Sequence, residues 1–128
     1  MKKDFQGWHY KKCAIDLVDQ RPNFHAREIW YSQIGLNVGY EQDGAGRDYL
    51  RPVIVYRKFN NEIFWAIPLT RTAKESPFYF QFVLDGNISS AILSQVRMVD
   101  AKRLSHKIGD ISEKDFENLN KKFKALLP

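Results

Sequence analysis

Two stretches of the sequence place polar side chains where packing does not require them. The first, GYEQDGAGRDYLRP from Gly39 to Pro52, is a glycine-rich loop that ends in Arg51 just before an apolar run. Glycine lets such a loop bring backbone amides close to a ligand, and an arginine at its exit can donate two hydrogen bonds to one phosphate. The second, AIPLTRT from Ala66 to Thr72, carries Thr70, whose hydroxyl can donate to a phosphate oxygen. Both stretches therefore suit a phosphate-containing ligand.

Each of these residues also has an ordinary structural role open to it. Arg51 fits a surface ion pair, and Thr70 fits a turn. The glycine-rich loop fits a plain hairpin connection, which is a common use of such sequences. The chemistry of the residues alone leaves both interpretations open.

The sequence carries none of the common metal, nucleotide or hydrolase motifs. Cys13 is the single cysteine, so neither a paired-cysteine zinc site nor an intrachain disulfide can form. No P-loop, dinucleotide fingerprint or GxSxG elbow occurs, and we expect neither a metal nor a cofactor. His9, His25 and His106 are scattered along the chain, which disfavours a histidine acid–base pair without excluding it. Cys13 could act as a nucleophile only if a base activated its thiol, and the sequence identifies no such base.

The composition is that of one globular domain, to which we assign residues 1–128. Of the 128 residues, 44% are hydrophobic, which suffices for one core but not for two. The net charge of +5 fits a polyanionic partner only weakly, because no segment is a basic arm. No run approaches the ~18 apolar residues of a membrane span, and the lone cysteine fits a reducing compartment. These features predict a cytoplasmic protein with no membrane association.

The middle of the chain predicts a small antiparallel β fold. Short runs rich in Ile, Val, Phe, Trp and Tyr alternate there with turn-prone groups. The predicted strands are Glu28 to Ile34, Pro52 to Phe59, Ile63 to Leu69, Phe78 to Leu84 and Ala91 to Val99. The predicted turns are Gly35 to Gly46, Asn60-Asn61, Lys74 to Pro77 and Asp85-Gly86-Asn87. Such tight connections favour a barrel or sandwich over a parallel sheet.

A short helix is predicted near the amino terminus. Phe5, Trp8 and Ile15 recur at roughly helical spacing within residues 5–18. The helix is expected to end by Arg21-Pro22, because proline disfavours helix in the residue before it. We assign the whole helical extension to residues 1–26.

An amphipathic helix is predicted at the carboxyl end. Ser112 stands three residues before Asp115, which is a variant of the helix capping box. The apolar residues that follow fall on one helical face: Phe116, Leu119, Phe123 and Leu126. We expect this face to pack on the barrel, which together with this closing helix makes up residues 27–128, although a partner-binding role is the alternative.

Four sequence blocks occur in one order along the chain. They are EIWYSQIGLNVGYEQDG (Glu28 to Gly44), RPVIVY (Arg51 to Tyr56), IPLT (Ile67 to Thr70) and AILSQVRMVDAKRLSHKIGDIS (Ala91 to Ser112). Each block is a weak signal alone, but the ordered set is specific. Over residues 28–127 the chain resembles the PemK/MazF family of small toxins. The resemblance implies a mainly β, SH3-like antiparallel barrel, also similar to CcdB-type toxins, that forms two-fold homodimers.

The resemblance also implies a sequence-specific, metal-independent endoribonuclease. Members cut single-stranded RNA by attack of a ribose 2′-OH on its adjacent phosphate, which leaves 2′,3′-cyclic phosphate and 5′-OH ends. The matching positions make Arg51, of the RP pair, and Thr70, of the P-x-T motif, the catalytic residues. A guanidinium and a hydroxyl suit stabilisation of the charge on the phosphorane, whereas the high pKa of arginine makes it a poor base. The base stays open, with Glu41 a candidate by its chemistry.

The same stretches supply candidate RNA contacts. They are Tyr40, Glu41, Gln42, Arg47, Tyr49, Gln95 and Arg97. Single-stranded RNA is read by hydrogen bonds to base edges and by aromatic stacking, and the two tyrosines are the stacking candidates. For Gln95 and Arg97 a structural role beside a dimer seam is the alternative.

Family resemblance implies a cognate antitoxin, typically acidic, whose carboxyl segment covers the RNA groove.

Three departures from the family pattern bear on specificity: the first 26 residues, the extra residues Ala45 to Leu50, and Arg71 after Thr70. Residues 1–26 are expected to cover part of the site surface or to extend the dimer. Two other functions remain open, namely a gyrase-binding toxin without an active site and an inactive relative that serves as a binding module.

Overall fold

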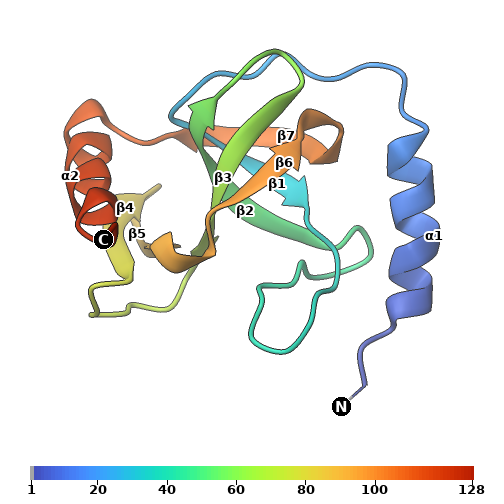
Figure 1. Cartoon of the computed structure of the whole chain (residues 1–128), viewed down its shortest axis with the longest axis horizontal. Helices are drawn as coiled ribbons and strands as arrows, with labels where there is room; N and C mark the ends of the chain where they lie inside the picture. Colours follow the sequence, from blue (N-terminus) through green and yellow to red (C-terminus); the bar gives the residue numbers. More distant parts are fainter. Residues whose placement is uncertain (1) are drawn as a thin grey trace.

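A curled antiparallel sheet forms the centre of the computed structural model, which describes residues 2–128 (Figure 1). Its strands are β1 (Glu28–Gln33), β2 (Leu50–Lys58), β3 (Ile63–Thr70), β4 (Tyr79–Leu84), β5 (Asn87–Ile92), β6 (Arg97–Asp100) and β7 (Leu104–Asp110). The strands lie in the order β4-β5-β3-β2-β1-β7, and β6 pairs with β3 beside β5. The mainly β, antiparallel architecture expected from the sequence is therefore confirmed.

Buried hydrophobic residues form two clusters, one on each face of this sheet, instead of the single core that the sequence predicted. Alternate residues of a strand point to opposite faces, so β2 sends Val53 and Val55 into one core and Ile54 into the other. Phe24, fully buried, closes the first core from the segment that precedes β1. The second core is closed by the carboxyl-terminal helix α2 (Glu113–Lys124) through the buried Leu119. The helices α1 and α2 lie on opposite sides of the sheet (Figure 1).

The predicted carboxyl-terminal helix is confirmed together with its cap. The Ser112 hydroxyl accepts a hydrogen bond from the Asp115 amide at 3.1 Å, which satisfies an amide that the first helical turn leaves unpaired. The Phe116 and Phe123 rings lie with their centroids 5.7 Å and 5.0 Å from that of Tyr56 on β2. The apolar face of α2 thus serves the core, as expected.

The predicted amino-terminal helix is also confirmed, as α1 (Phe5–Asp16). Asp4 caps it by accepting a hydrogen bond from the Gly7 amide at 2.9 Å. Trp8 and Ile15 are its buried residues, which matches the helical spacing seen in the sequence. No helix within residues 2–128 is long and apolar enough to cross a bilayer.

One strand prediction was wrong and one strand was missed. The segment Ala91 to Val99 is two strands, β5 and β6, separated by a single 3₁₀ turn, η1 (Leu93–Gln95). Both strands pair with β3, and the turn lets the chain shift register between them. The missed strand, β7, carries mostly polar and exposed residues, because only one face of this edge strand meets the core. The other four predicted strands match β1 to β4 within two residues at each end.

Glu28, the first residue of β1, is a carboxylate that is only 8% exposed. Its Oε1 accepts hydrogen bonds from the His25 amide at 2.7 Å and from Trp30 Nε1 at 3.0 Å. Its Oε2 lies 3.2 Å from Lys107 Nζ on β7. Burial alone would raise the pKa of Glu28, but the bonds from Trp30, His25 and Lys107 outweigh it and hold that pKa below its ordinary value.

We expect Glu28→Gln to lower the free energy of unfolding by about 2 kcal/mol near neutral pH, because the variant loses the charge on three hydrogen bonds. The pKa of Glu28 is lower in the folded chain than the ~4.3 of an unfolded one, so its contribution is complete above that value and is lost as the pH falls through the folded pKa. Urea unfolding of both proteins between neutral and acidic pH should therefore show the difference shrinking in acid. A difference that stays constant would contradict this account.

Candidate active site

Arg51 lies beside the end of β3 that carries Thr70. The two strands are antiparallel, and the last pair of their register is Val53 opposite Pro68. Beyond that pair the Arg51 side chain still reaches β3, because its Nη1 donates to the carbonyl oxygen of Leu69, the residue before Thr70. The two residues predicted to be catalytic therefore lie near each other in the fold.

Arg51 is held by two backbone carbonyl groups. Its Nε donates to the carbonyl oxygen of Asp43 at 2.6 Å, and its Nη1 donates to that of Leu69 at 3.0 Å. The side chain is half-buried, and this burial lowers the pKa of Arg51, an effect that the nearby Asp43 charge partly offsets. The guanidinium nevertheless stays cationic, since arginine titrates far above neutral pH. Within the described residues, these bonds leave Nη2 available to a ligand.

Thr70 ends β3 and is half-buried. Its Oγ1 lies 3.4 Å from the Thr72 amide and 3.5 Å from the Thr72 hydroxyl, both of which are long for hydrogen bonds. Thr70 therefore helps to shape the turn after β3 while its hydroxyl stays within reach of a ligand beside Arg51.

The loop between β1 and β2 folds back on itself through Asn37 and Asp43. Asn37 Nδ2 donates to the carbonyl oxygen of Gln42 at 2.8 Å, and the Asn37 amide donates to Asp43 Oδ1 at 2.6 Å. The Gly44 amide donates to the carbonyl oxygen of Gly35 at 2.7 Å, which closes the base of the loop. Sequence reasoning did not assign roles to Asn37 or Asp43, although Asp43 belongs to the EQDG block.

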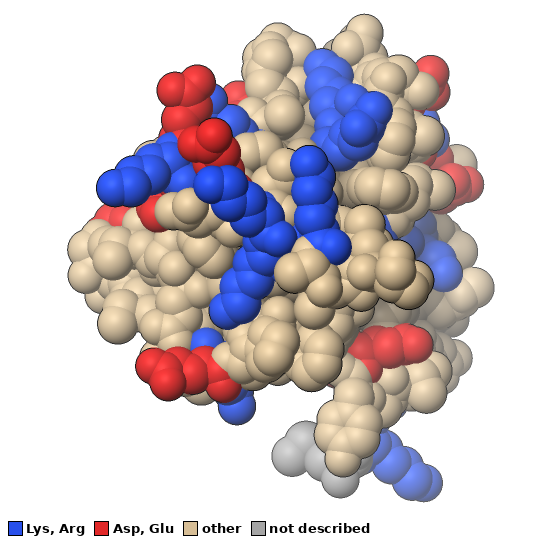
Figure 2. Space-filling view, turned by 60° about the vertical axis from the view of Figure 1, so that its left-hand side comes forward, with Lys and Arg blue, Asp and Glu red and all other residues tan. Residues whose placement is uncertain are grey.

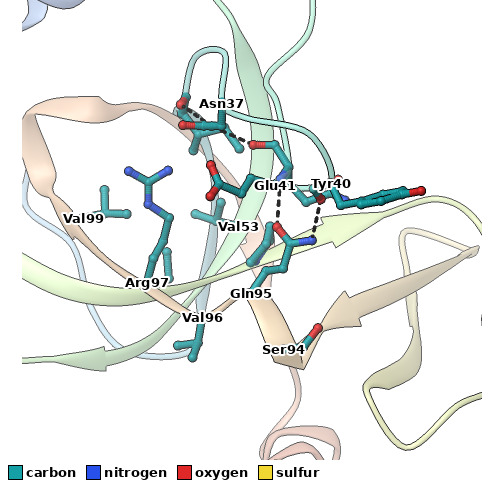
Figure 3. A pocket seen from close by; sticks show the side chains of 13 residues that line it. Asn37, Tyr40, Glu41, Val53, Ser94, Gln95, Val96, Arg97 and Val99 are labelled. Atoms are coloured by element: carbon teal, nitrogen blue, oxygen red, sulfur yellow. Dashed lines mark hydrogen bonds between the residues drawn. The ribbon is translucent and has the colours of Figure 1, made fainter.

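A cavity of about 530 Å³ lies between this loop and the segment that joins η1 to β6 (Figure 3). Its floor is made by Val53 on β2 and by Ala66 and Pro68 on β3, on one face of the sheet. Arg51 and Thr70 stand two positions beyond Val53 and Pro68 along β2 and β3. They do not line the cavity but stand at the end of its floor. The arrangement can hold a ligand in the cavity with an anionic group beside Arg51.

Comparison with known proteins gives this arrangement a family. A family model described as the PemK-like, MazF-like toxin of type II toxin-antitoxin systems matches residues 25–127. The chain belongs to this family. A search of curated proteins by sequence found no match.

Solved structures agree with the PemK/MazF fold. MazF from Deinococcus radiodurans is 20% identical, with a TM-score of 0.63 over 84% of this chain and 97% of that one. The Mycobacterium tuberculosis toxin MazF-mt6 is 15% identical, with a TM-score of 0.59 over 77% and 94%. A mycobacterial protein described as an endoribonuclease in complex with its cognate antitoxin is 11% identical, with a TM-score of 0.63 over 84% and 97%. At these identities the likeness establishes the fold.

In this PemK/MazF chain, five of the seven predicted RNA contacts line the cavity. Glu41 and Arg97 line it from opposite segments, and Figure 3 shows both side chains extending toward the end near Asn37. Tyr40 is 99% exposed, so its ring is open to solvent. The remaining two, Gln42 and Gln95, are joined to each other through a hydrogen bond.

Gln95 fastens the β1–β2 loop to the opposite wall of the cavity. Its Oε1 accepts from the Gln42 amide at 2.8 Å, and its Nε2 donates to the carbonyl oxygen of Tyr40 at 3.1 Å (Figure 3). Both functional ends of the amide are thereby engaged with backbone. Gln95 stays a predicted RNA contact, but its side chain has a structural task in this chain.

The other two predicted contacts lie away from the cavity. The Tyr49 ring packs against Trp8 of α1, with the ring centroids 5.2 Å apart, and Tyr49 is half-buried. Arg47 is exposed in the turn that precedes Tyr49 and is not among the residues that line the cavity. The insertion Ala45 to Leu50 thus carries these two residues toward α1 and solvent rather than across the floor.

The three histidines lie on separate elements rather than at the cavity. His9 is on α1, 3.8 Å from the Cys13 sulfur, and His25 precedes β1 beside Glu28. His106 is on β7, where its ring lies 5.0 Å from that of Tyr31. The fold does not bring them together as an acid–base pair.

Replacing Gln95 with Leu should loosen the loop without unfolding the protein. The variant removes one acceptor and one donor, and an average hydrogen bond contributes about 1 kcal/mol. We expect the Gln42 amide to exchange its proton about five- to tenfold faster, with the core strands unchanged. Amide hydrogen exchange followed by NMR measures this. Ser94→Ala, at a neighbouring cavity residue, is the control, and unaltered Gln42 protection in Gln95→Leu would refute the role given to Gln95.

Proposed function

We propose that this chain is a sequence-specific, metal-independent endoribonuclease toxin that cleaves single-stranded RNA. The observation that carries the proposal is the contact of Arg51 with the end of β3 that carries Thr70, beside a cavity, in a member of the PemK/MazF family. A toxin that acted only by binding a protein would not need a half-buried, carbonyl-anchored arginine beside a hydroxyl. One structural neighbour, described as an endoribonuclease, supports the same reaction class.

The proposed reaction is a transesterification within the RNA chain. The ribose 2′-oxygen attacks the adjacent phosphorus, and the bond from phosphorus to the 5′-oxygen of the next nucleotide breaks. The proton lost by the 2′-OH goes to a base, and the departing 5′-oxygen takes up a proton, so that the ends are a 2′,3′-cyclic phosphate and a 5′-OH. Negative charge accumulates on the non-bridging oxygens in the transition state, which is where fixed donors lower the barrier.

Arg51 and Thr70 supply these donors. Arg51 is already oriented by the carbonyl groups of Asp43 and Leu69, so it needs little reorganisation as charge develops. Arg51 is also our candidate for donating a hydrogen bond or a proton to the departing oxygen. Thr70 adds a neutral hydroxyl donor.

Glu41 is our candidate for the base. It lines the cavity, and its Oε1 accepts a hydrogen bond from the Val38 amide at 3.1 Å. That bond orients the carboxylate and leaves Oε2 for a substrate proton. The Glu41 carboxylate could instead form a hydrogen bond to the edge of an RNA base. As a general base it would affect the chemical step, whereas as an RNA contact it would affect substrate binding.

Single-stranded RNA suits the surface around the cavity. Tyr40, almost fully exposed at the rim, offers a ring on which a base can stack. Arg97 and Glu41 offer a donor and an acceptor within the cavity for base edges. One face of the molecule, shown in Figure 2, carries basic side chains across its middle and upper part, with acidic ones mostly toward its margins. A basic face suits a polyanion such as RNA.

We further propose a cognate antitoxin and a homodimer as the partners of this cytoplasmic toxin. Solved neighbours include a MazE–MazF assembly and an endoribonuclease bound to its antitoxin. The net charge of +5 complements an acidic antitoxin segment that would compete with RNA for the cavity.

The proposal is tested with purified protein and a long single-stranded transcript in EDTA. Arg51→Ala should reduce cleavage about 10²- to 10³-fold, as expected for loss of an oriented charged donor. Arg51→Lys keeps the charge but not the fork, and should recover only part of the rate. Thr70→Val, which keeps the shape without the hydroxyl, should cost about tenfold. Product ends are identified by mass spectrometry.

Arg57→Ala is the matched control. Arg57 is exposed near the other end of β2, and this substitution removes the same charge as Arg51→Ala. Melting temperatures of all variants separate folding from chemistry, which matters because Arg51 bonds to two carbonyl groups. Intact RNA with folded wild-type protein would overturn the ribonuclease proposal and favour a gyrase-binding toxin or an inactive relative. Cleavage that survives Arg51→Ala would remove Arg51 from the mechanism.

A further inference from the structure

The segment that precedes the family match packs on the loop of the candidate site. The match begins at residue 25, whereas α1 ends at Asp16. Trp8 of α1 is only 6% exposed, and its ring lies directly against Gly35 at the start of the loop. A Cβ on Gly35 would come within 2.0 Å of Trp8 Cε2, and the Gly35 φ of +77° also favours glycine. Trp8 therefore fixes where α1 lies relative to the loop.

Lys3, just before α1, forms polar contacts with the same loop. Its Nζ lies 2.9 Å from Asp43 Oδ2 and donates to the carbonyl oxygen of Asn37 at 2.6 Å. The side chains of Lys3 and Asp43 are each 28% exposed, so solvent screens this pair less than a fully exposed one. The other carboxylate oxygen of Asp43 accepts from the Asn37 amide at 2.6 Å. Asp43 is thus restrained from two sides.

Asp43 connects these contacts to the catalytic arginine. The carbonyl oxygen of Asp43 is the acceptor for Arg51 Nε, at 2.6 Å. Hydrogen bonds of this length are sensitive to direction, so a displacement of the Asp43 backbone moves the guanidinium that it orients. Misplacement of a catalytic group by about 1 Å is enough to slow a reaction substantially.

We propose that Lys3 is a positioning residue for Arg51, because it holds Asp43 and the Asp43 carbonyl holds the guanidinium. The proposal rests on the ribonuclease function proposed above and adds to it a residue outside the part of the chain that the family model matches. Trp8 supports the arrangement by placing the amino-terminal segment within reach of the loop. Lys3 contacts the loop and not the reacting atoms, so its effect is on geometry.

The kinetic test compares Lys3→Met, Lys3→Arg and Lys12→Met in the full chain. Lys12 is exposed on α1, and its side chain forms no ion pair or hydrogen bond with residues 2–128, so Lys12→Met removes the same charge without breaking such a contact. The substrate is a fluorogenic oligonucleotide built around the main cut site that wild-type protein produces in a long transcript. Lys3→Met should lower kcat about five- to tenfold and change KM by less than about twofold, because Arg51 acts in the transition state. Lys3→Arg should restore most of the rate, and Lys12→Met should match wild type.

A double variant tests whether the effect passes through Asp43. Asp43→Asn keeps the backbone carbonyl but removes the charge that pairs with Lys3. If the two residues act as one unit, Lys3→Met combined with Asp43→Asn should be no slower than the more damaging single variant. Losses that multiply would separate Lys3 from Asp43 and overturn the proposal.

An NMR measurement reads the geometry without relying on activity. The Nε proton of Arg51 is bonded to the Asp43 carbonyl, so its exchange with solvent should be about fivefold faster in Lys3→Met and unchanged in Lys12→Met. Equal exchange of the Arg51 Nε proton in all proteins would overturn the proposal. A rise in KM with unchanged kcat in Lys3→Met would also overturn it, because that result would make Lys3 a direct RNA contact. If wild-type protein leaves RNA intact, the ribonuclease function fails, and the exchange comparison still decides whether Lys3 positions Arg51.

Discussion

The register between β2 and β3 is the constraint on which the candidate site depends. β2 contributes to both cores at once, with Val53 and Val55 on one face and Ile54 on the other. A slip of one residue would move every side chain of the strand to the wrong face, so burial of these residues fixes the pairing. Arg51 and Thr70 stand two positions beyond Val53 and Pro68, the last pair of that register. The geometry proposed for catalysis is therefore a consequence of how the core packs.

A site built partly on a polar loop needs another source of rigidity. The loop between β1 and β2 places few apolar side chains in either core, and ordering each of its residues costs about 1–2 kcal/mol of backbone entropy. Three groups from elsewhere in the chain restrain it: the guanidinium of Arg51, the amide of Gln95, and the Lys3–Trp8 segment. These restraints hold the loop backbone while Tyr40 stays exposed for a ligand.

The sequence predicted the parts of the fold whose signals are local. The Ser112 cap with the apolar face of α2, and the strongly apolar runs of β2 and β3, are visible in the order of residues alone. The single strand expected from Ala91 to Val99 was wrong, because the 3₁₀ turn at its centre depends on how β5 and β6 share the edge of β3. β7 was missed because its residues are mostly polar.

The candidate site was predictable where it rests on motifs and not where it rests on distant contacts. The RP and P-x-T motifs pointed to Arg51 and Thr70, and Arg51 contacts β3 at Leu69, the residue before Thr70. The contact of Lys3 with Asp43 spans forty positions of sequence and leaves no local pattern. The packing of Tyr49 on Trp8 is equally distant, so an aromatic side chain in a glycine-rich loop suggested RNA stacking although the ring meets α1.

The charges around Arg51 are arranged so that it keeps its affinity for an anion. Both groups that orient it are carbonyl oxygens, which direct the guanidinium without neutralising it. The nearby carboxylate of Asp43 is instead bonded to Lys3 and to the Asn37 amide. Left unpaired, that carboxylate would repel a phosphate bound at Arg51, and turned toward Arg51 it would compete with the phosphate for the guanidinium. The ion pair with Lys3 therefore does two things at once: it fixes the Asp43 backbone that orients Arg51, and it offsets a negative charge beside the position proposed for the scissile phosphate.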